Sequence, residues 1–419
     1  MTPPLKASGR ALVPPFEVMN ILSRVADLQA AGRDVISLCA GEPSGGAPRA
    51  VSAEAARIHA SGLALTYTGA LGIRPLRAAV AAHYGRWYGL DVAPEEVAIT
   101  TGSSGAFMLA FLAAFDHGDR VALARPGYPA YRNILRALGC EVVEIDCGPA
   151  QRYQPTPEQL DAAAAHGALD GLVLASPANP TGTMVTRTEL AALTAWCAAN
   201  GVRLVSDEIY HGITYPADPQ APDARGVCAW ELDRTGVAVS SFSKYWGMTG
   251  WRLGWALMPE DLAGAMEALA GNVALCPPAP AQLAAVEAFT EESYAGADAA
   301  VAGYAKVRRL LLENLGRLNW GHAAPADGAF YLYADLGAQL AGFADSAAYC
   351  RALLEQEGVA LVPGADFDAV NGIRYVRLSF AAGEDAVAAA LERILRFQRS
   401  AAAPSPQARP HPLPPRFGH

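Results

Sequence analysis

The segment Ser241–Gly254, which reads SFSKYWGMTGWRLG, places a lysine directly after an apolar run. That run, GVAVSSFS at residues 236–243, has the continuous apolar character of a strand buried on both faces of a sheet. Lysine is among the residues least often buried, so Lys244 at the inner end of such a strand needs either a partner or a chemical task. The segment therefore predicts a buried sheet and marks the end of one strand as a candidate site.

Five similar runs precede this one and alternate with amphipathic helical patterns. They are EVAITT (96–101), DRVALA (119–124), CEVVEI (140–145), GLVLAS (171–176) and VRLVSDE (202–208). Apolar runs bounded by Gly, Pro or polar residues and joined by crossover helices are typical of a doubly wound α/β domain. Ligands of such sheets bind beyond the carboxyl ends of the strands, so we expect function in the residues that follow each run.

A change of pattern near residue 290 predicts a second domain. A long helical pattern rich in Ala, Leu and Arg is followed by the strand-like segments GAFYLYADL, GVALVPG and IRYVRLSF and by a last helix. Helices and strands segregated in this way favour a smaller α+β domain. We therefore expect a large domain at residues 49–290 and a small domain formed by residues 15–48 and 291–397. The Pro-rich residues 398–419 are expected to be disordered.

The composition is that of a globular, cytoplasmic protein. Of the 419 residues, 52% are hydrophobic and 17% are charged. The net charge of −9 argues against sequence-independent binding of nucleic acid, which needs a basic surface. The seven cysteines form no CxxC pair and no histidine cluster has metal-ligand spacing, so we expect reduced thiols and no metal site. The N-terminal segment lacks the apolar core of a signal peptide, and the apolar run Ser103–Phe115 is too short to span a bilayer. We expect neither a membrane nor a nucleic-acid partner.

The first strand-end motif, TTGSSGAF at Thr100–Phe107, indicates an anion site. It follows a predicted strand and opens an amphipathic segment, so the backbone N–H groups and the hydroxyls of Ser103 and Ser104 would point outward from a helix N-terminus. A phosphate suits such a site. The motif taken alone is equally typical of a small-residue helix cap, and it is neither a Walker A sequence nor GxGxxG.

Later strand ends carry further polar residues. Asp207 ends the run VRLVSD, where a carboxylate needs a cationic or N–H partner, although it could also serve as a helix N-cap. Asn179 lies between prolines in a rigid turn, which suits either a ligand contact or an Asx turn. Arg252, in a Gly-flanked loop, offers a forked donor matched to phosphate or carboxylate. Lys244 would be activated by burial, because burial lowers the pKa of a lysine and a neutral amine forms a Schiff base with an aldehyde.

Together these residues form the set that binds pyridoxal phosphate: a phosphate cradle, an acid for a ring nitrogen, an aromatic ring, an amide donor and an amine nucleophile. In order and spacing, the motifs SFSKYWGMTGWRLG, SPANPTG, SDEIY and VRLSF resemble those of the class I/II aminotransferases, which are fold type I pyridoxal phosphate enzymes. The resemblance covers roughly residues 15–397. It implies an α/β large domain with a mostly parallel sheet of the seven-stranded type between helices, plus a smaller α+β domain.

The resemblance assigns a role to each residue of the catalytic set. Lys244 would form the internal aldimine and move the proton between substrate Cα and cofactor C4′, while Asp207 would pair with the protonated pyridine nitrogen. Tyr210 and Asn179 would bond the ring's O3′ oxygen, and Tyr128 in RPGYPAY would stack on the ring rather than serve as a core tyrosine.

The resemblance also names the residues that hold the phosphate and the substrate. The phosphate would be bound by Ser103, Ser104, Ser241 and Arg252. Tyr67 matches a tyrosine that reaches the neighbouring subunit's phosphate, which implies a homodimer. Arg377 in VRLSF would clamp the substrate α-carboxylate, the alternative being a surface strand arginine. Gly41 would bring its backbone close to the substrate.

The activity implied is ping-pong transamination of an L-amino acid with a 2-oxo acid. Other pyridoxal phosphate reactions use the same set, so a β-lyase, a decarboxylase or a γ-eliminating synthase stays open as the alternative. A ligand-binding regulator on this scaffold is disfavoured because Lys244 and Asp207 are both present and no helix-turn-helix precedes or follows the fold. A nicotinamide dehydrogenase is disfavoured because GxGxxG is missing.

Two departures from the family pattern bear on the substrate. The phosphate loop reads GSSGAF and lacks the extra cation with which some relatives bind a dicarboxylate, so an uncompensated carboxylate would be unfavourable there. This favours neutral or aromatic amino donors. The segment SGGAP after GEP replaces the Asp-Phe and Thr-Pro of relatives, and its two glycines give more freedom near the substrate side chain.

Overall fold

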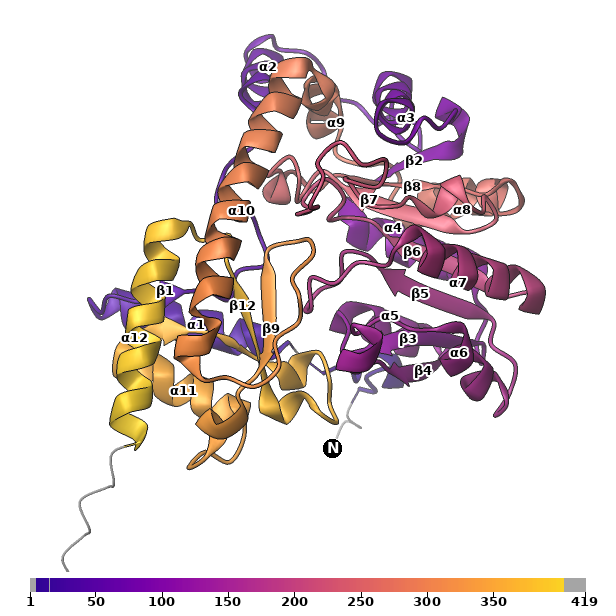
Figure 1. Ribbon diagram of the computed structural model, residues 1–419. Helices are drawn as coiled ribbons and strands as arrows, with labels where there is room; N and C mark the ends of the chain where they lie inside the picture. Colours follow the sequence, from indigo (N-terminus) through magenta and orange to yellow (C-terminus); the bar gives the residue numbers. More distant parts are fainter. Residues whose placement is uncertain (1–4, 15, 403–419) are drawn as a thin grey trace, which may run out of the picture.

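The structure, a computed structural model, describes residues 5–14 and 16–402. Its centre is a seven-stranded sheet with helices on both faces (Figure 1). In spatial order the strands are β2 (Val97–Thr100), β8 (Gly254–Leu257), β7 (Val237–Ser241), β6 (Arg203–Asp207), β5 (Gly171–Ala175), β3 (Arg120–Arg125) and β4 (Glu141–Asp146). The ladders from β7 through β6, β5 and β3 to β4 are parallel, whereas β8 is antiparallel to both β7 and β2. The predicted α/β fold with a mostly parallel sheet is confirmed.

Helices cover both faces of this sheet, which explains why its strands are apolar on both sides. In β5, Val173 belongs to the buried cluster that includes residues of α4, α5 and α8, whereas Leu172 and Leu174 belong to the cluster that includes residues of α6 and α7. The helices of this part are α2 (Arg49–Ala60), α3 (Arg74–Tyr88), α4 (Gly102–Ala114), α5 (Pro129–Leu138), α6 (Pro157–Ala164), α7 (Arg187–Asn200), α8 (Glu260–Val273) and α9 (Ala279–Ala285). Each of the six apolar runs contains one strand of the sheet, and only β8 is absent from the sequence-based expectation.

Two smaller sheets lie beside the large one. β9 (Tyr331–Asp335), β12 (Tyr375–Ser379) and β11 (Val362–Pro363) form an antiparallel sheet, and β1 (Ile36–Ser37) pairs in parallel with β10 (Val359–Ala360). Their helices are α1 (Glu17–Ala30), α11 (Ser346–Glu357) and α12 (Glu384–Ala402), and the 28-residue α10 (Glu291–Leu318) runs alongside (Figure 1). The pairing of β1 with β10 brings the N-terminal segment to the C-terminal part of the chain. The domain bounds 49–290, 15–48 and 291–397 remain our proposal.

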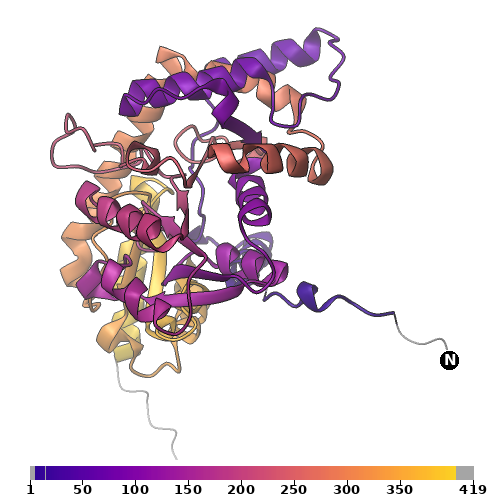
Figure 2. The same ribbon diagram turned by 90° about the vertical axis from the view of Figure 1, so that its right-hand side faces the viewer.

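The two ends of the described chain differ. Residues 5–14 extend from the body of the molecule, and Leu5 and Leu12 are 100% and 85% exposed (Figure 2). At the other end α12 continues through Ala402, so the prediction that disorder begins at residue 398 is wrong for residues 398–402. The helix continues because Phe397 and Gln398 are still buried, and the following alanines favour helix. The rest of that predicted tail, residues 403–419, lies outside the described residues.

Within the described ranges, no helix is long and apolar enough to cross a bilayer.

Candidate active site

One cavity of about 610 Å³ collects most of the side chains singled out from the sequence. It lies where the carboxyl end of β6, the start of α4, the loop after β7 and strand β12 meet. The expected residues among its lining are Gly41, Ser103, Ser104, Tyr128, Asn179, Asp207, Tyr210, Lys244, Arg252 and Arg377. Sequence segments more than 300 residues apart thus meet at the sheet edge that parallel strand topology predicts.

Lys244 follows β7 and points its amine into this cavity. Its Nζ donates a 2.5 Å hydrogen bond to the carbonyl oxygen of Gly41 and lies 5.8 Å from the centre of the Tyr210 ring. Burial lowers the pKa of Lys244 to about 8, and the positive charges of Arg377 and Arg252 act in the same direction. The amine therefore spends an appreciable fraction of time neutral near pH 7, as a nucleophile must.

Asp207 ends β6 in the same cavity and is buried. Burial raises the pKa of this carboxyl to about 6, opposed by hydrogen bonds from the Tyr131 hydroxyl and the Ile209 backbone N–H and by the charge of Lys244. The Ile209 bond to Oδ1 is 3.1 Å long, while Tyr131 donates to Oδ2. Asp207 is thus mostly ionised at neutral pH, and a cation in the cavity would lower its pKa further.

The start of α4 forms a cradle with the loop that carries Arg252. Gly102 opens α4 with φ of +70°, and a Cβ there would collide with the guanidinium of Arg252. A Cβ at Gly254 would lie 2.6 Å from the backbone nitrogen of Ser103. Both glycines are therefore needed for the close approach of an arginine and two serines to a helix N-terminus, an arrangement suited to phosphate. Arg252 Nη1 donates to the Thr249 carbonyl oxygen at 2.9 Å.

Arg377 is held at the opposite wall. Its Nη1 donates to Asn179 Oδ1 at 3.1 Å and its Nη2 to the carbonyl oxygen of Cys39 at 2.6 Å, and the guanidinium lies 4.6 Å from the Tyr331 ring centre. Arg377 is only 4% exposed, and its Nε has no partner among the described residues. Arg377 is thus a buried cation that an amide oxygen and a carbonyl oxygen hold in one orientation, and one of its N–H groups is unpartnered. Such a group is suited to an anionic ligand.

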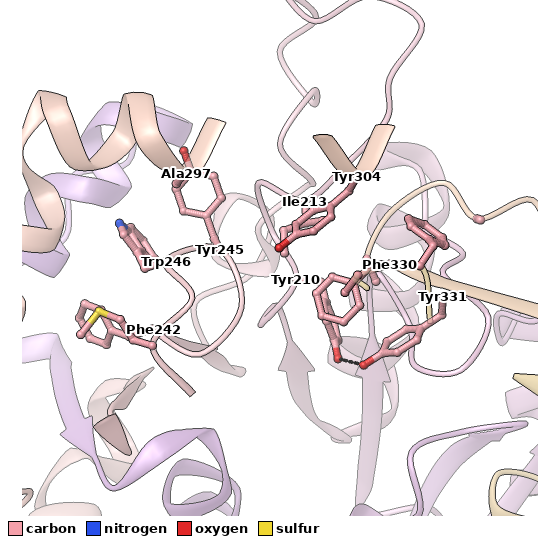
Figure 3. Close-up of a cluster of buried hydrophobic side chains, with 14 of the residues drawn as sticks. Tyr210, Ile213, Phe242, Tyr245, Trp246, Ala297, Tyr304, Phe330 and Tyr331 are labelled. Carbon is pink, nitrogen blue, oxygen red and sulfur yellow. Dashed lines mark hydrogen bonds between the residues drawn. The ribbon is translucent and has the colours of Figure 1, made fainter. Parts of the chain in front are cut away.

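Three aromatic residues border the space between these groups. The hydroxyls of Tyr210 and Tyr331 are 2.7 Å apart (Figure 3). Tyr128 stands edge-on to Tyr131, with ring centres 5.4 Å apart. A Cβ at Gly41 would lie 2.9 Å from the Tyr331 hydroxyl, so this glycine allows the N-terminal segment to approach the site.

Two predicted residues lie outside this cavity. The hydroxyl of Ser241 donates to Leu253 O at 3.2 Å and its oxygen lies 2.9 Å from Ser243 Oγ, and Ser243 lines the cavity in its place. Tyr67 is 79% exposed. Their roles toward the phosphate stay predictions.

Among the lining residues that the sequence reading missed are Tyr131, Ser243 and Tyr331. Tyr131 is the last residue of the motif RPGYPAY, and Ser243 directly precedes Lys244. Their positions in or next to a predicted site motif could therefore have identified both as site residues. Tyr331, which contacts both Tyr210 and Arg377, had no signal apart from its place in a predicted strand.

The cavity fits pyridoxal phosphate by the chemistry of its donors. At Gly102 and Gly254 the missing side chains let the Arg252 guanidinium and the backbone after it lie directly against the N-terminus of α4, so positive charge and free backbone N–H groups meet at one place. The same cavity is lined by a carboxylate, an aromatic ring and an amine, which are the partners of a pyridine nitrogen, a flat ring and an aldehyde.

The comparisons with known proteins agree with this chemistry. The family profile described as "Aminotransferase class I and II" matches residues 33–394. A valine–pyruvate aminotransferase of Mycobacterium tuberculosis is 53% identical over 386 residues, covering 92% of this chain and 96% of that protein. An aspartate aminotransferase of Geobacillus stearothermophilus is 33% identical, covering 94% and 98% of the two chains.

Solved structures give the same result for the fold. The crystal structure of an aminotransferase from Mycobacterium tuberculosis has a TM-score of 0.90 and 51% identity, covering 95% of this chain and 100% of that one. The aspartate aminotransferase of Thermus thermophilus with maleate has a TM-score of 0.85 and 33% identity, covering 94% and 100%.

Proposed function

The chain belongs to the class I and II aminotransferase family, and on that premise we propose that its cavity transfers the amino group of a neutral aliphatic L-amino acid, such as valine, to a 2-oxo acid such as pyruvate. The reaction is a transamination that depends on pyridoxal phosphate. The observation that supports the site most strongly is that Lys244 and Asp207 line the same cavity as Arg377.

Lys244 acts first as a nucleophile and then as a base. When bound, pyridoxal phosphate supplies an aldehyde to the amine and a ring that accepts the electron pair left at substrate Cα. With a pKa of about 8, roughly a tenth of the Lys244 amines are neutral at pH 7, against fewer than one in a thousand for an unperturbed lysine. With cofactor and substrate bound, the neutral Lys244 amine would be the base that removes the proton from substrate Cα and returns it on the cofactor side.

The other residues of the cavity hold the cofactor and substrate in place. Asp207, ionised above its pKa of about 6 and kept anionic by the hydrogen bond from Tyr131, would pair with the protonated ring nitrogen. Tyr128 would cover the face of the ring, and Tyr210 and Asn179 would bond the ring oxygen. The phosphate would be bound by Ser103, Ser104 and Arg252 at the start of α4, and Ser241, which the family resemblance adds to this set, lies outside the cavity lining.

Arg377 binds the substrate α-carboxylate. Its guanidinium is already oriented by Asn179 and Cys39, so the side chain loses little conformational entropy when the substrate binds. The unpartnered Nε–H and an Nη–H of the same guanidinium offer the carboxylate a bidentate contact. The backbone of Gly41, which holds the Lys244 amine in this structure, then lies beside the substrate.

The charge of the cavity supports a neutral side chain on the substrate. Among the described lining residues the cations are Lys244, Arg252 and Arg377, and each has a role already. The further charged side chains there are acidic, Glu42 and Asp366. A second carboxylate on the substrate would lie among these acids without a partner, which is unfavourable in a cavity of low polarity. The valine–pyruvate activity named for the relative agrees with this reading.

We also propose that the chain works as a homodimer to which Tyr67 contributes. Tyr67, Leu63 and Leu65 are 79%, 55% and 41% exposed, and Val273 and Leu275 are 59% and 48% exposed. Gln282 joins the two segments, since its side chain donates to Thr68 Oγ1 and to the Pro277 carbonyl oxygen. An apolar surface of this kind is typical of an interface, and a second copy covering it would bring Tyr67 toward the partner's phosphate. The seven free thiols, six of them buried, favour a cytoplasmic location.

The experiment that tests the function follows the cofactor's absorbance after adding single amino acids without a 2-oxo acid. Conversion by valine or alanine, with the matching 2-oxo acid formed in equal amount, is expected. Release of ammonia would instead indicate elimination, and release of carbon dioxide a decarboxylase. In Lys244→Ala, borohydride should no longer fix the cofactor covalently to the protein, and specific fixation in that variant would contradict the role of Lys244.

A further inference from the structure

Part of the cavity lining has no role toward the cofactor or the α-carboxylate in the proposed function. This wall comes from the start of α1, where Phe16, Val18, Met19 and Leu22 line the cavity. These four side chains are apolar, and they come from a helix whose sequence carries no motif. With the substrate amine at Lys244 and its carboxylate at Arg377, the group left to face a remaining wall is the substrate side chain.

The start of α1 is fixed by a residue almost 350 positions away in the chain. The N-cap residue Phe16 makes no side-chain cap hydrogen bond. Instead, Asp366 Oδ1 accepts from the Glu17 backbone N–H at 2.9 Å and Oδ2 from that of Val18 at 3.0 Å. A carboxylate at a helix N-terminus satisfies free N–H groups and interacts favourably with the helix dipole. Asp366 is 9% exposed and lines the cavity itself.

Two further contacts join this wall to the substrate-binding groups. The ring of Phe16 stacks on that of Tyr128, with centres 6.2 Å apart and planes at 15°. The ring of Phe367, over which the Arg377 guanidinium lies at 5.0 Å, belongs to the apolar cluster against which Val18 and Leu22 pack. The wall is therefore held between the aromatic residue proposed to cover the cofactor ring and the arginine proposed to hold the carboxylate.

We propose that the first two turns of α1, capped by Asp366, determine which amino acid side chain the site prefers, favouring branched aliphatic chains over the methyl group of alanine. The inference rests on the proposed function and adds the element that selects its substrate. Met19 and Leu22 supply the apolar contact, and Asp366 positions them while its charge opposes a second carboxylate on the substrate. When an apolar pocket distinguishes two substrates that differ by one methylene group, their kcat/KM values differ by about 10- to 200-fold. Valine has two more methyl groups than alanine, so the expected difference in kcat/KM is large.

The test uses the ratio of kcat/KM for L-valine to that for L-alanine in the amino-donor half-reaction of the holoenzyme. Both donors share the amine, Cα and carboxylate, so the ratio cancels any change in cofactor content or in the amount of folded protein. Met19→Ala is expected to lower the ratio about tenfold with alanine kept within about twofold. Met19→Leu, which conserves volume, should restore most of the ratio. Asn20→Ala is the matched control, because Asn20 is an exposed neighbour on the same helix, bonded to Glu17 and outside the cavity lining.

Asp366→Asn tests the cap and the charge together. The amide keeps one acceptor oxygen for the two N–H groups and removes the negative charge, so the valine-to-alanine ratio should fall and kcat/KM for L-aspartate should rise several-fold. An unchanged ratio in Met19→Ala, or no change in either measure in Asp366→Asn, overturns the inference. These outcomes are separable from a failure of the proposed function, in which neither valine nor alanine would convert the cofactor of the unaltered enzyme.

Discussion

Replacing Glu208 with glutamine is expected to stabilise the protein at pH 8 but hardly at all at pH 5. Glu208 follows Asp207 in the chain and is 1% exposed. Its Oε1 accepts from the Ala229 backbone N–H at 2.8 Å and from Ser206 Oγ at 3.1 Å, but Oε2 has no hydrogen-bond partner among the described residues and lies 3.7 Å from His211 Nδ1. The carboxylate form thus has one oxygen unsatisfied.

Burial raises the pKa of Glu208 from 4.5 to about 7. The folded state therefore holds a proton that the unfolded chain releases between these values, and stability falls as the pH rises through that window. The full penalty above pH 7 is about 3 kcal/mol, from 1.36 kcal/mol per pKa unit. Burial lowers the pKa of His211 to about 3, so this side chain is neutral in the folded state across the window and brings no positive charge to the Glu208 carboxylate. Its own effect on stability is common to the two proteins and cancels in the comparison. Glutamine cannot ionise, so Glu208→Gln escapes the penalty.

The assay is denaturant unfolding of the apoprotein and of Glu208→Gln at equal concentration, at pH 5 and at pH 8. We expect the mutant's gain in unfolding free energy to be about 2 to 3 kcal/mol larger at pH 8 than at pH 5. Comparing the two pH values cancels the change in packing, which is common to both. A gain that is equal at the two pH values would refute the argument that Glu208 is held protonated by burial.

Two further predictions concern the cofactor site. Gly102→Ala places a methyl group on the Arg252 guanidinium at a backbone φ of +70°, so cofactor affinity should fall at least tenfold in a titration of the apoenzyme, while Gly264→Ala, whose added Cβ meets open space in a helix, should bind normally. Tyr131→Phe removes a hydrogen bond that lowers the pKa of Asp207, so the acidic limb of the pH profile of kcat/KM should move upward from about pH 6; an unmoved limb would show that Asp207 does not control it.

The strands were predictable from the sequence wherever burial acts on both faces of a segment. Val173 and its neighbours Leu172 and Leu174 face opposite layers of helix, and the result in the sequence is a continuous apolar run. β8 was missed because its four residues, GWAL, begin at Gly254 directly after the motif loop and read as part of it. The end of α12 was missed because composition alone does not show that Phe397 and Gln398 still have a buried face.

The site was predictable to the extent that its residues end strands. Asp207 and Lys244 follow apolar runs, and parallel topology brings such ends to one edge. Tyr331 could not be found in this way, because its contact with Tyr210 joins positions 121 residues apart and its own strand belongs to a different sheet. The apolar wall of α1 was hidden for a similar reason, since the cap on which it depends is supplied by Asp366.

The setting of Arg377 has a consequence for recombination between related enzymes. Its two hydrogen-bond partners lie 198 and 338 residues earlier in the chain, on Asn179 and on Cys39. A single crossover anywhere between positions 39 and 377 therefore gives a chimera in which these three residues come from different parents. Libraries of shuffled genes should yield active enzymes mainly where both parents place an amide oxygen and a backbone carbonyl oxygen at the same positions around the guanidinium. Blocks exchanged in pairs, N-terminal with C-terminal, should survive more often than blocks exchanged singly.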